Sequence, residues 1–255
     1  MMNEADRLHQ VLVSVAERLA TVLEGAEFER GDGYWFMSFP TFPIRDLNGV
    51  WADSDAATDD LAARRAQAGD RRTPFTVMTR AGKTPAVEHA ARELGLTNEI
   101  RIPGMTVTAQ DLNDPASELE VLRVETADGL AQALEVCASG FGAPPELVAS
   151  IYSLEVAQLE GLETYLGRVD GRDVSTAIGC TIDRTCGIFS VATPEEHRGR
   201  GYGAAITAKA VRDGFDAGAN LGGLQSSSMG ESVYKRLGFR EVETYTLFAP
   251  PPKSH

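Results

Sequence analysis

A glycine-rich segment in the second half of the chain has the residue types and spacing of an anion-binding loop. It reads Arg198-Gly-Arg-Gly201-Tyr-Gly203, and it stands between a predicted strand at 186–192 and a predicted helix. Glycines at a helix N-terminus let an anion approach the unpaired backbone N–H groups, and the helix dipole adds attraction. The segment therefore predicts a phosphate site.

Three kinds of phosphate-binding loop can be compared with this segment. A P-loop ends in Gly-Lys-Ser or Gly-Lys-Thr, and the segment contains neither. A dinucleotide-binding fold places its glycines directly after the strand, whereas residues 193–198 intervene here, and the acidic residue it expects is absent from 221–227. The remaining pattern is Arg or Gln-x-x-Gly-x-Gly or Ala, which Arg198, Gly201 and Gly203 satisfy.

A second motif, Tyr234-Lys-Arg-Leu-Gly-Phe239, follows on a predicted helix. We expect Ser228 and Glu231 to form a capping box for this helix. With both motifs in this order, separated by a helix and a strand, the second half resembles the GNAT superfamily of acyl-CoA-dependent N-acyltransferases. The resemblance implies that residues 126–248 form two helices, three strands, a helix, a strand, a helix and a strand.

The resemblance also implies a site for acetyl-CoA as the acyl donor. Backbone groups of Val191 and Ala192 would bind the pantetheine, and the N–H groups of residues 198–204 would bind the pyrophosphate. Ser227 stands where the family usually has an Asn, seven positions before the tyrosine. The expected donor-binding residues are Val191, Ala192, Thr193, Arg198, Gly199, Arg200, Gly201, Tyr202, Gly203, Ala204 and Ser227.

Transfer to an amine requires that the amine lose a proton and that the departing thiolate gain one. A phenol with an ordinary pKa of about 10 is protonated at neutral pH, so Tyr234, which the resemblance places at the sulfur, is the predicted general acid. The alternative is a tyrosine that only packs on its helix. Glu163 is the predicted general base, with a chain of waters as the alternative. We expect Glu195 and Glu196 to be solvated near the helix N-terminus, and His197 to lie at the surface.

Two clusters of like charge bear on the substrates. Segment 126–167 has six acidic residues and no Lys, Arg or His. The resemblance places it beside the acceptor cleft, which favours a cationic amine; the alternative is a solvated acidic face. In the first half, the basic residues Arg64, Arg65, Arg71 and Arg72 either meet the CoA phosphates or, as we expect, end a surface helix.

Hydrophobic periodicity predicts a mixed α/β fold. The expected helices are 4–24, 55–68, 87–94, 129–137, 145–151, 206–215 and 230–237, and the expected strands are 34–39, 44–51, 75–79, 162–169, 175–182, 186–192, 221–227 and 243–248. Asp170-Gly171 predicts a hairpin turn between two of these strands.

The two halves resemble each other at an offset at which Ala91–Thr97 aligns with Tyr234–Arg240. We therefore predict two tandem GNAT-like domains, 1–110 and 111–255, each a mixed, mostly antiparallel sheet flanked by helices, joined near 103–128. The first half lacks the glycine motif and has Ala91 in place of the tyrosine, which predicts a degenerate copy without its own acyl-CoA site. The alternative is a chance similarity of short amphipathic elements.

Composition excludes several classes of protein. The 255 residues are 43% apolar and 24% charged, which is typical of a globular protein, and the net charge of −13 disfavours nucleic acid as a partner. No apolar stretch reaches the roughly 18 residues of a membrane span, and we expect a cytoplasmic protein. Three cysteines without CxxC spacing and four scattered histidines predict neither a metal site nor a disulfide framework.

The sequence thus predicts an N-acetyltransferase that passes the acetyl group of acetyl-CoA directly to a small-molecule or peptide amine, as a monomer or homodimer and without a metal. The alternative is a non-catalytic acyl-CoA-binding or regulatory protein with the same fold.

Overall fold

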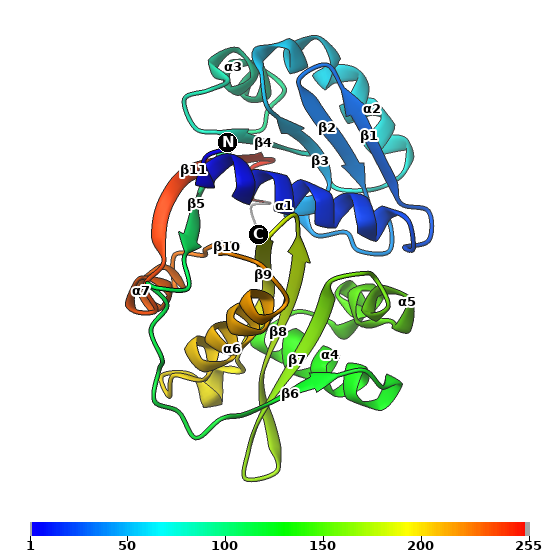
Figure 1. Ribbon diagram of the computed structural model, residues 1–255. Coiled ribbons are helices and arrows are strands. Elements are labelled where there is room, and N and C mark those ends of the chain that lie inside the picture. Colours follow the sequence, from blue (N-terminus) through cyan, green and yellow to red (C-terminus); the bar gives the residue numbers. More distant parts are fainter. Residues whose placement is uncertain (1, 253–255) are drawn as a thin grey trace. The chain divides into compact units, whose positions relative to one another are not determined.

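The computed structural model describes residues 2–252, which form two compact units (Figure 1). The C-unit consists of Gly104–Val242 and the chain up to Val15. The N-unit consists of Ala16–Pro103 and the chain from Glu243 onward. Helices and strands alternate in both, so the predicted mixed α/β fold class is confirmed.

The C-unit is built on a mixed sheet with the strand order β5-β10-β9-β8-β7-β6. Neighbouring strands are antiparallel except for the parallel pair β9 and β10. The strands are β5 (Asn98–Val107, from Gly104 onward), β6 (Glu120–Val124), β7 (Leu162–Val169), β8 (Arg172–Ile182), β9 (Thr185–Ala192) and β10 (Leu221–Gln225).

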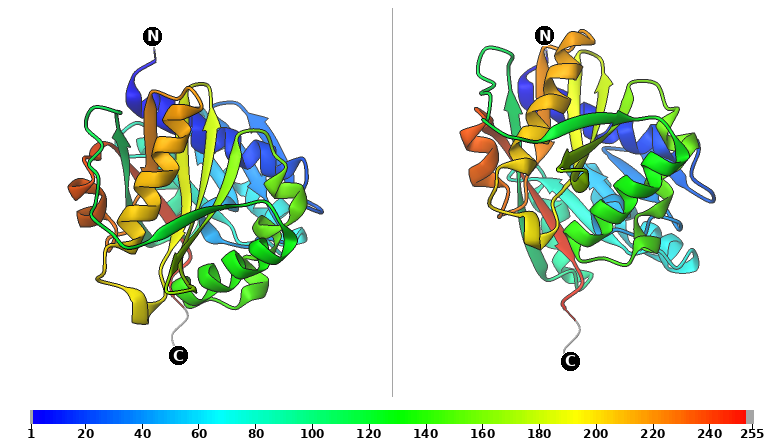
Figure 2. Two further views of the ribbon diagram at one scale, coloured as in Figure 1. Left: turned by 60° about the horizontal axis from the view of Figure 1, so that its bottom comes forward. Right: turned by 90° about the horizontal axis from the view of Figure 1, so that it is seen from below.

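Helices cover both faces of this sheet (Figure 2). They are α4 (Ala127–Phe141), α5 (Leu154–Ala157), α6 (Tyr202–Asp216) and α7 (Glu231–Arg236), with the first part of α1 (Glu4–Ala20). On one face of the sheet, Gly179 of β8 faces Ala210 of α6. On the opposite face, Gly140 of α4 lies against Ala192 of β9, whose strand partner is Thr176. A core cluster on the α6 face includes Tyr165, Ile188, Ile206 and Leu224. Among residues 2–252, no helix is both long and apolar enough to span a membrane.

Local sequence signals explain where several C-unit elements begin and end. The Thr126 hydroxyl accepts a hydrogen bond from the Gly129 N–H (3.2 Å) and caps α4, and Gly142, with φ +61°, ends it. Asp170 and Gly171 have φ +50° and +75°, as a two-residue hairpin turn requires. The predicted hairpin between β7 and β8 is therefore confirmed.

The N-unit has a smaller sheet with the order β1-β2-β3-β4-β11, in which β3 and β4 form the parallel pair. Its elements are β1 (Glu27–Gly31), β2 (Tyr34–Ser38), β3 (Gly49–Ala52), α2 (Leu61–Asp70), β4 (Thr76–Arg80), α3 (Pro85–Glu93) and, from Glu243 onward, β11 (Arg240–Ala249). Its core includes Phe36, Val77, Leu96 and Phe248. Each unit thus contains an antiparallel three-stranded meander, a crossover helix and a parallel fourth strand.

The last strand at one end of each unit's sheet comes from the other half of the chain. Strand β5 follows α3 of the N-unit, yet Gly104–Val107 pairs with β10 of the C-unit. Strand β11 follows α7 of the C-unit, yet Tyr245–Phe248 pairs with β4 of the N-unit. The division into tandem domains at residues 110 and 111 stays a prediction.

Several expectations about local structure were wrong. Residues 145–151 form two 3₁₀ helices, Pro145–Leu147 and Ala149–Tyr152, in place of the expected helix. Strands β1, β5 and β6 were not predicted, and β6 lies inside the expected linker. The capping box on Ser228 and Glu231 is replaced by Ser227, whose hydroxyl accepts from the Gly230 N–H (3.2 Å) and whose carbonyl accepts from the Glu231 N–H (3.1 Å).

Candidate functional site

The parallel pair β9 and β10 separates part of the way along the C-unit sheet. Pairing runs from Leu221–Thr185 to Leu224–Ile188, and β9 continues to Ala192 without a partner in β10 among the described residues. A bulge follows at once, because Ile178 pairs with Phe189 but Thr176 pairs with Ala192. Ser190, inside the bulge, has φ +50°. Residues 189–191 are only partly buried, so this end of β9 is accessible in part.

The predicted phosphate loop connects this open strand end to α6. Gly199 and Gly201 have φ +76° and +82°, and α6 begins at Tyr202. The first helical hydrogen bond is that of the Ala205 N–H with the Gly201 carbonyl (3.0 Å). Within residues 2–252, the N–H groups of 199–204 have no backbone acceptor. They lie at the positive end of a 15-residue helix, which fits a diphosphate.

Both positive-φ glycines leave room on the outer side of the loop. A Cβ added at Gly199 or Gly201 would have no protein atom within 4 Å. Gly203 instead faces the strand, since its added Cβ would lie 3.6 Å from Thr193 Oγ1 and 4.0 Å from Val191 Cγ1. The structure therefore brings Val191, Thr193 and the loop together, as expected.

Arg198 and Ala192 are held by the protein itself. The Arg198 guanidinium donates to the carbonyls of Thr193 (3.1 Å) and Gly140 (2.7 Å), and so fixes the loop to the C-terminal end of α4. The Arg198 N–H is also used, because it donates to the Glu195 carbonyl (3.1 Å). The Ala192 carbonyl accepts from the Ser175 hydroxyl (3.0 Å). Arg198 thus positions the loop, and the available N–H groups begin at Gly199.

Tyr234 lies against α6. It packs against the C-unit core and forms a hydrogen bond with Thr207 of α6, and its ring is 5.8 Å from that of Phe239. Burial raises the pKa of Tyr234 to about 12, against a smaller opposite effect of its hydrogen bond with Thr207 of α6. The phenol is therefore protonated at neutral pH, as a general acid requires. The sequence offered no signal that singled out Thr207.

Glu163 lies elsewhere in the C-unit. It is on β7, and its carboxylate is 3.6 Å from the Arg123 guanidinium of β6, which also pairs with the buried Asp213 (3.0 Å). Strands β8 and β9 stand between β7 and β10, so Glu163 is about 14 Å across the sheet from β10 at ordinary strand spacing. The geometry does not bring Glu163 and Tyr234 together.

The other candidate ionisable groups are mostly solvated. Glu195, Glu196 and the acidic residues Asp128, Glu135, Glu146, Glu155 and Glu160 are exposed. His197 is partly buried rather than at the surface. Throughout the described residues 2–252, no group of three or more His, Cys, Asp or Glu is arranged to hold a metal ion.

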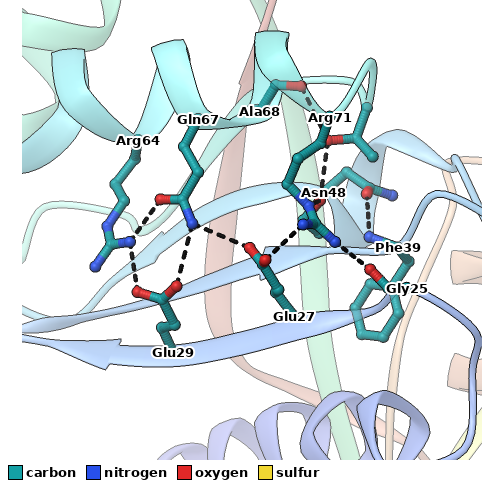
Figure 3. A network of polar contacts seen from close by, with 11 residues as sticks. Gly25, Glu27, Glu29, Phe39, Asn48, Arg64, Gln67, Ala68 and Arg71 are labelled. Carbon is teal, nitrogen blue, oxygen red and sulfur yellow. Dashed lines mark hydrogen bonds and ion pairs between the residues drawn. The ribbon is translucent and has the colours of Figure 1, made fainter.

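Two arginines of the basic cluster in the first half, Arg64 and Arg71, form ion pairs within the N-unit (Figure 3). Arg64 pairs with Glu29 and Arg71 pairs with Glu27, so α2 is joined to β1. Gln67 bridges both carboxylates, at 3.0 Å from Glu27 and 3.1 Å from Glu29. Arg64 and Arg71 thus stabilise the surface helix α2, which agrees with the expectation that the cluster ends such a helix.

Among its described residues, the N-unit has no counterpart of the open strand pair. Strands β3 and β4 stay paired to Ala52–Thr79, at the end of β3. An acidic 3₁₀ helix, Asp55–Asp60, follows in place of a glycine loop. Asp55 accepts from the N–H groups of Ala86 (2.9 Å) and Val87 (3.3 Å), so a carboxylate already occupies the N-terminus of α3.

Comparison with known proteins agrees with this geometry. The family model of FR47-like proteins matches residues 165–248. The chain is similar to a GCN5-related N-acetyltransferase from Kribbella flavida, with 20% identity, a TM-score of 0.72 and coverage of 99% of this chain and 98% of that one. It is also similar to one from Sphaerobacter thermophilus, with 18% identity, a TM-score of 0.61 and coverage of 99% and 96%.

A GCN5-related N-acetyltransferase-like protein from Streptococcus suis is similar over 97% of this chain and 99% of that one, with 14% identity and a TM-score of 0.58. No curated protein matches the sequence. The chain therefore has the fold of the GNAT superfamily, and the likeness extends over both units.

Proposed function

We propose that the protein is an N-acetyltransferase that transfers the acetyl group of acetyl-CoA directly to an amine. The observation that carries the proposal is the separation of β9 from β10, followed by six N–H groups without backbone acceptors at the start of α6. The open strand edge offers hydrogen bonds to the amides of the pantetheine, and the loop offers N–H donors to the diphosphate. The GNAT fold supports the same activity.

In this proposal Tyr234 supplies the proton that the departing thiolate needs. The phenol is neutral below its pKa of about 12, and it forms a hydrogen bond with Thr207 in the second turn of α6. The proton of the amine leaves to water, since Glu163 is already paired with Arg123. Each chain has one donor site, because the N-unit has paired strands and an acidic segment at the equivalent position.

The acceptor in this proposal is a small-molecule or peptide amine. Five exposed carboxylates in the segment from α4 to the start of β7 favour a cationic amine. They are Asp128, Glu135, Glu146, Glu155 and Glu160.

Calorimetric titration with acetyl-CoA, followed by a CoA-release assay with a panel of amines, tests the proposal. We expect saturable binding of the donor and release that depends on an amine, with polyamines and neutral amines compared at equal concentration. Saturable binding without amine-dependent release supports the rival function, a non-catalytic acyl-CoA-binding or regulatory protein. Absence of binding contradicts both functions and leaves only the fold.

A further inference from the structure

The end of β10 carries a side-chain amide whose nitrogen has no hydrogen-bond partner. Gln225 is the last residue of β10, and its Nε2 is buried without a partner in the described part of the chain. A buried donor that stays unpaired is costly, so such groups usually have a partner in the working protein. Gln225 stands where β9 and β10 separate, at the candidate site. The missing partner is therefore expected among the atoms of a substrate.

The side chain of Gln225 lies on the sheet face opposite α6. A Cβ added at Gly223, two residues earlier, would be 2.8 Å from Leu8 Cδ1 of α1. Side chains two residues apart on a strand share a face, so Gln225 also lies on the α1 side. Leu224, between them, belongs to the core cluster on the α6 side, as this alternation requires.

The positions on either side of Gln225 leave room for a ligand. Its partner in β5 is Gly104, which has no side chain. On β9 the first residue beyond the last pair is Phe189, whose ring lies back over Gly187, since a Cβ added at Gly187 would be 2.8 Å from Cε2 of that ring. The carboxamide is thus bordered by a glycine and an aromatic residue, and neither has a side-chain oxygen that could accept its N–H.

In the proposed function the donor occupies the other face. The N–H groups at the start of α6 and the Tyr234 hydroxyl, which forms a hydrogen bond with Thr207, lie on the α6 side. An amine that attacks the thioester must approach its carbon from a side that the donor leaves open. The α1 side of the separated strand ends, where Gln225 lies, is such a side.

We propose that Gln225 binds the acceptor, with Nε2 donating to an uncharged oxygen of that molecule, a carbonyl or a hydroxyl. A carboxylate is the poorer partner, because the strand neighbours Gly104 and Phe189 are uncharged and burial of an unpaired charge is costly. The inference rests on the proposed function and refines its acceptor, which becomes an amine that also carries a neutral hydrogen-bond acceptor.

Acetylation of glycinamide and of propylamine by the full chain, measured as CoA release, provides the test. The two amines are similar in size, and only glycinamide has a carbonyl oxygen. In Gln225→Leu we expect kcat/KM for glycinamide to fall about tenfold through a higher KM, as for the loss of one hydrogen bond, while the value for propylamine stays within about twofold. The dissociation constant of acetyl-CoA should not change.

Gln10→Leu is the matched control. Gln10 is also partly buried in the C-unit, but its Nε2 already donates to the Ser14 hydroxyl (3.0 Å). This variant should keep the wild-type ratio of the two amines. Thermal unfolding adds a readout without substrate: Gln10→Leu should lower the melting temperature, whereas Gln225→Leu should not, because it breaks no side-chain N–H hydrogen bond of the free protein.

Three results overturn the inference alone. They are an equal loss for both amines in Gln225→Leu, a melting temperature that falls as far as in Gln10→Leu, and a wild type that uses other amines but not glycinamide. Absence of CoA release with every amine of the panel overturns the proposed function and this inference with it.

Discussion

Replacing Tyr234 by Phe removes one hydroxyl and keeps the ring that packs near Phe239. If the phenol protonates the thiolate, its acidity must be compared with that of a thiol in similar surroundings. Burial raises the pKa of Tyr234 to about 12 and that of the Cys186 thiol, in the same core, to about 11. For a thiolate desolvated to the same extent as Cys186, proton transfer from Tyr234 would be uphill by about one pKa unit, or ~1.4 kcal/mol. That cost is compatible with general acid catalysis.

We expect kcat to fall about 100-fold in Tyr234→Phe, while the dissociation constant of acetyl-CoA stays within about twofold. Because the acid form is lost only as pH rises through about 12, this group should cause no decrease in wild-type kcat below about pH 11. The assay is amine-dependent CoA release at saturating donor, measured from pH 6 to 10.

Tyr165→Phe is the control for this variant. Tyr165 is a tyrosine of the same core, but it lies on β7, away from the loop, with Asp213 and Arg123 near its hydroxyl. The control should keep kcat. Wild-type turnover in Tyr234→Phe, or an equal loss in both variants, would refute the assignment of the proton to Tyr234.

Three further predictions concern the loop, the buried ion pair and the number of sites. Gly201→Val should abolish acetyl-CoA binding in calorimetry, whereas Gly218→Val, with φ +100° at the other end of α6, should lose only stability; binding by both variants would place the site elsewhere. Asp213→Asn should lower the free energy of unfolding in urea by about 2 kcal/mol relative to the exposed Asp216→Asn, because Arg123 and Lys209 lose a charged acceptor. Burial raises the pKa of Asp213, but the hydrogen bonds from Lys209 and Arg123 outweigh it and hold the pKa below its usual value. The stability that these bonds add is therefore present above the usual pKa of an aspartate and is lost as the pH falls through the lowered pKa. If the two variants still differ in stability below that pH, the ion pair is not the cause of the difference. Titration should saturate at one acetyl-CoA per chain, and two equivalents would show a second site in the N-unit.

The elements around the phosphate loop could be predicted because their signals are local. Asp170 and Gly171 specify a hairpin turn, and the glycines before α6 specify a helix start with free N–H groups. Short-range signals failed at 145–151, where the apolar spacing of a helix is shared by two short 3₁₀ turns. They also failed in β5, where Pro103 and Gly104 indicate a break in an otherwise extended strand.

The remaining features depend on pairing between distant segments. The bulge at Ser190 exists because β8 and β9 shift register, and no residue type near Ser190 predicts this shift. Glu163 could be placed on a strand, but its neighbours Arg123 and Asp213 come from β6 and α6. Sequence spacing alone could not predict that Arg123 pairs with both Glu163 and Asp213.

The exchange of β5 and β11 bears on how the chain folds as it is synthesised. A nascent chain usually completes its amino-terminal domain first. Here β4 keeps an open edge until the residues after Glu243 have left the ribosome, although most of the N-unit is made long before. An unpaired edge recruits any matching strand, and the β11 of a neighbouring chain matches it. Crowded polysomes should therefore yield strand-swapped dimers, whereas dilute, slow synthesis should yield monomers.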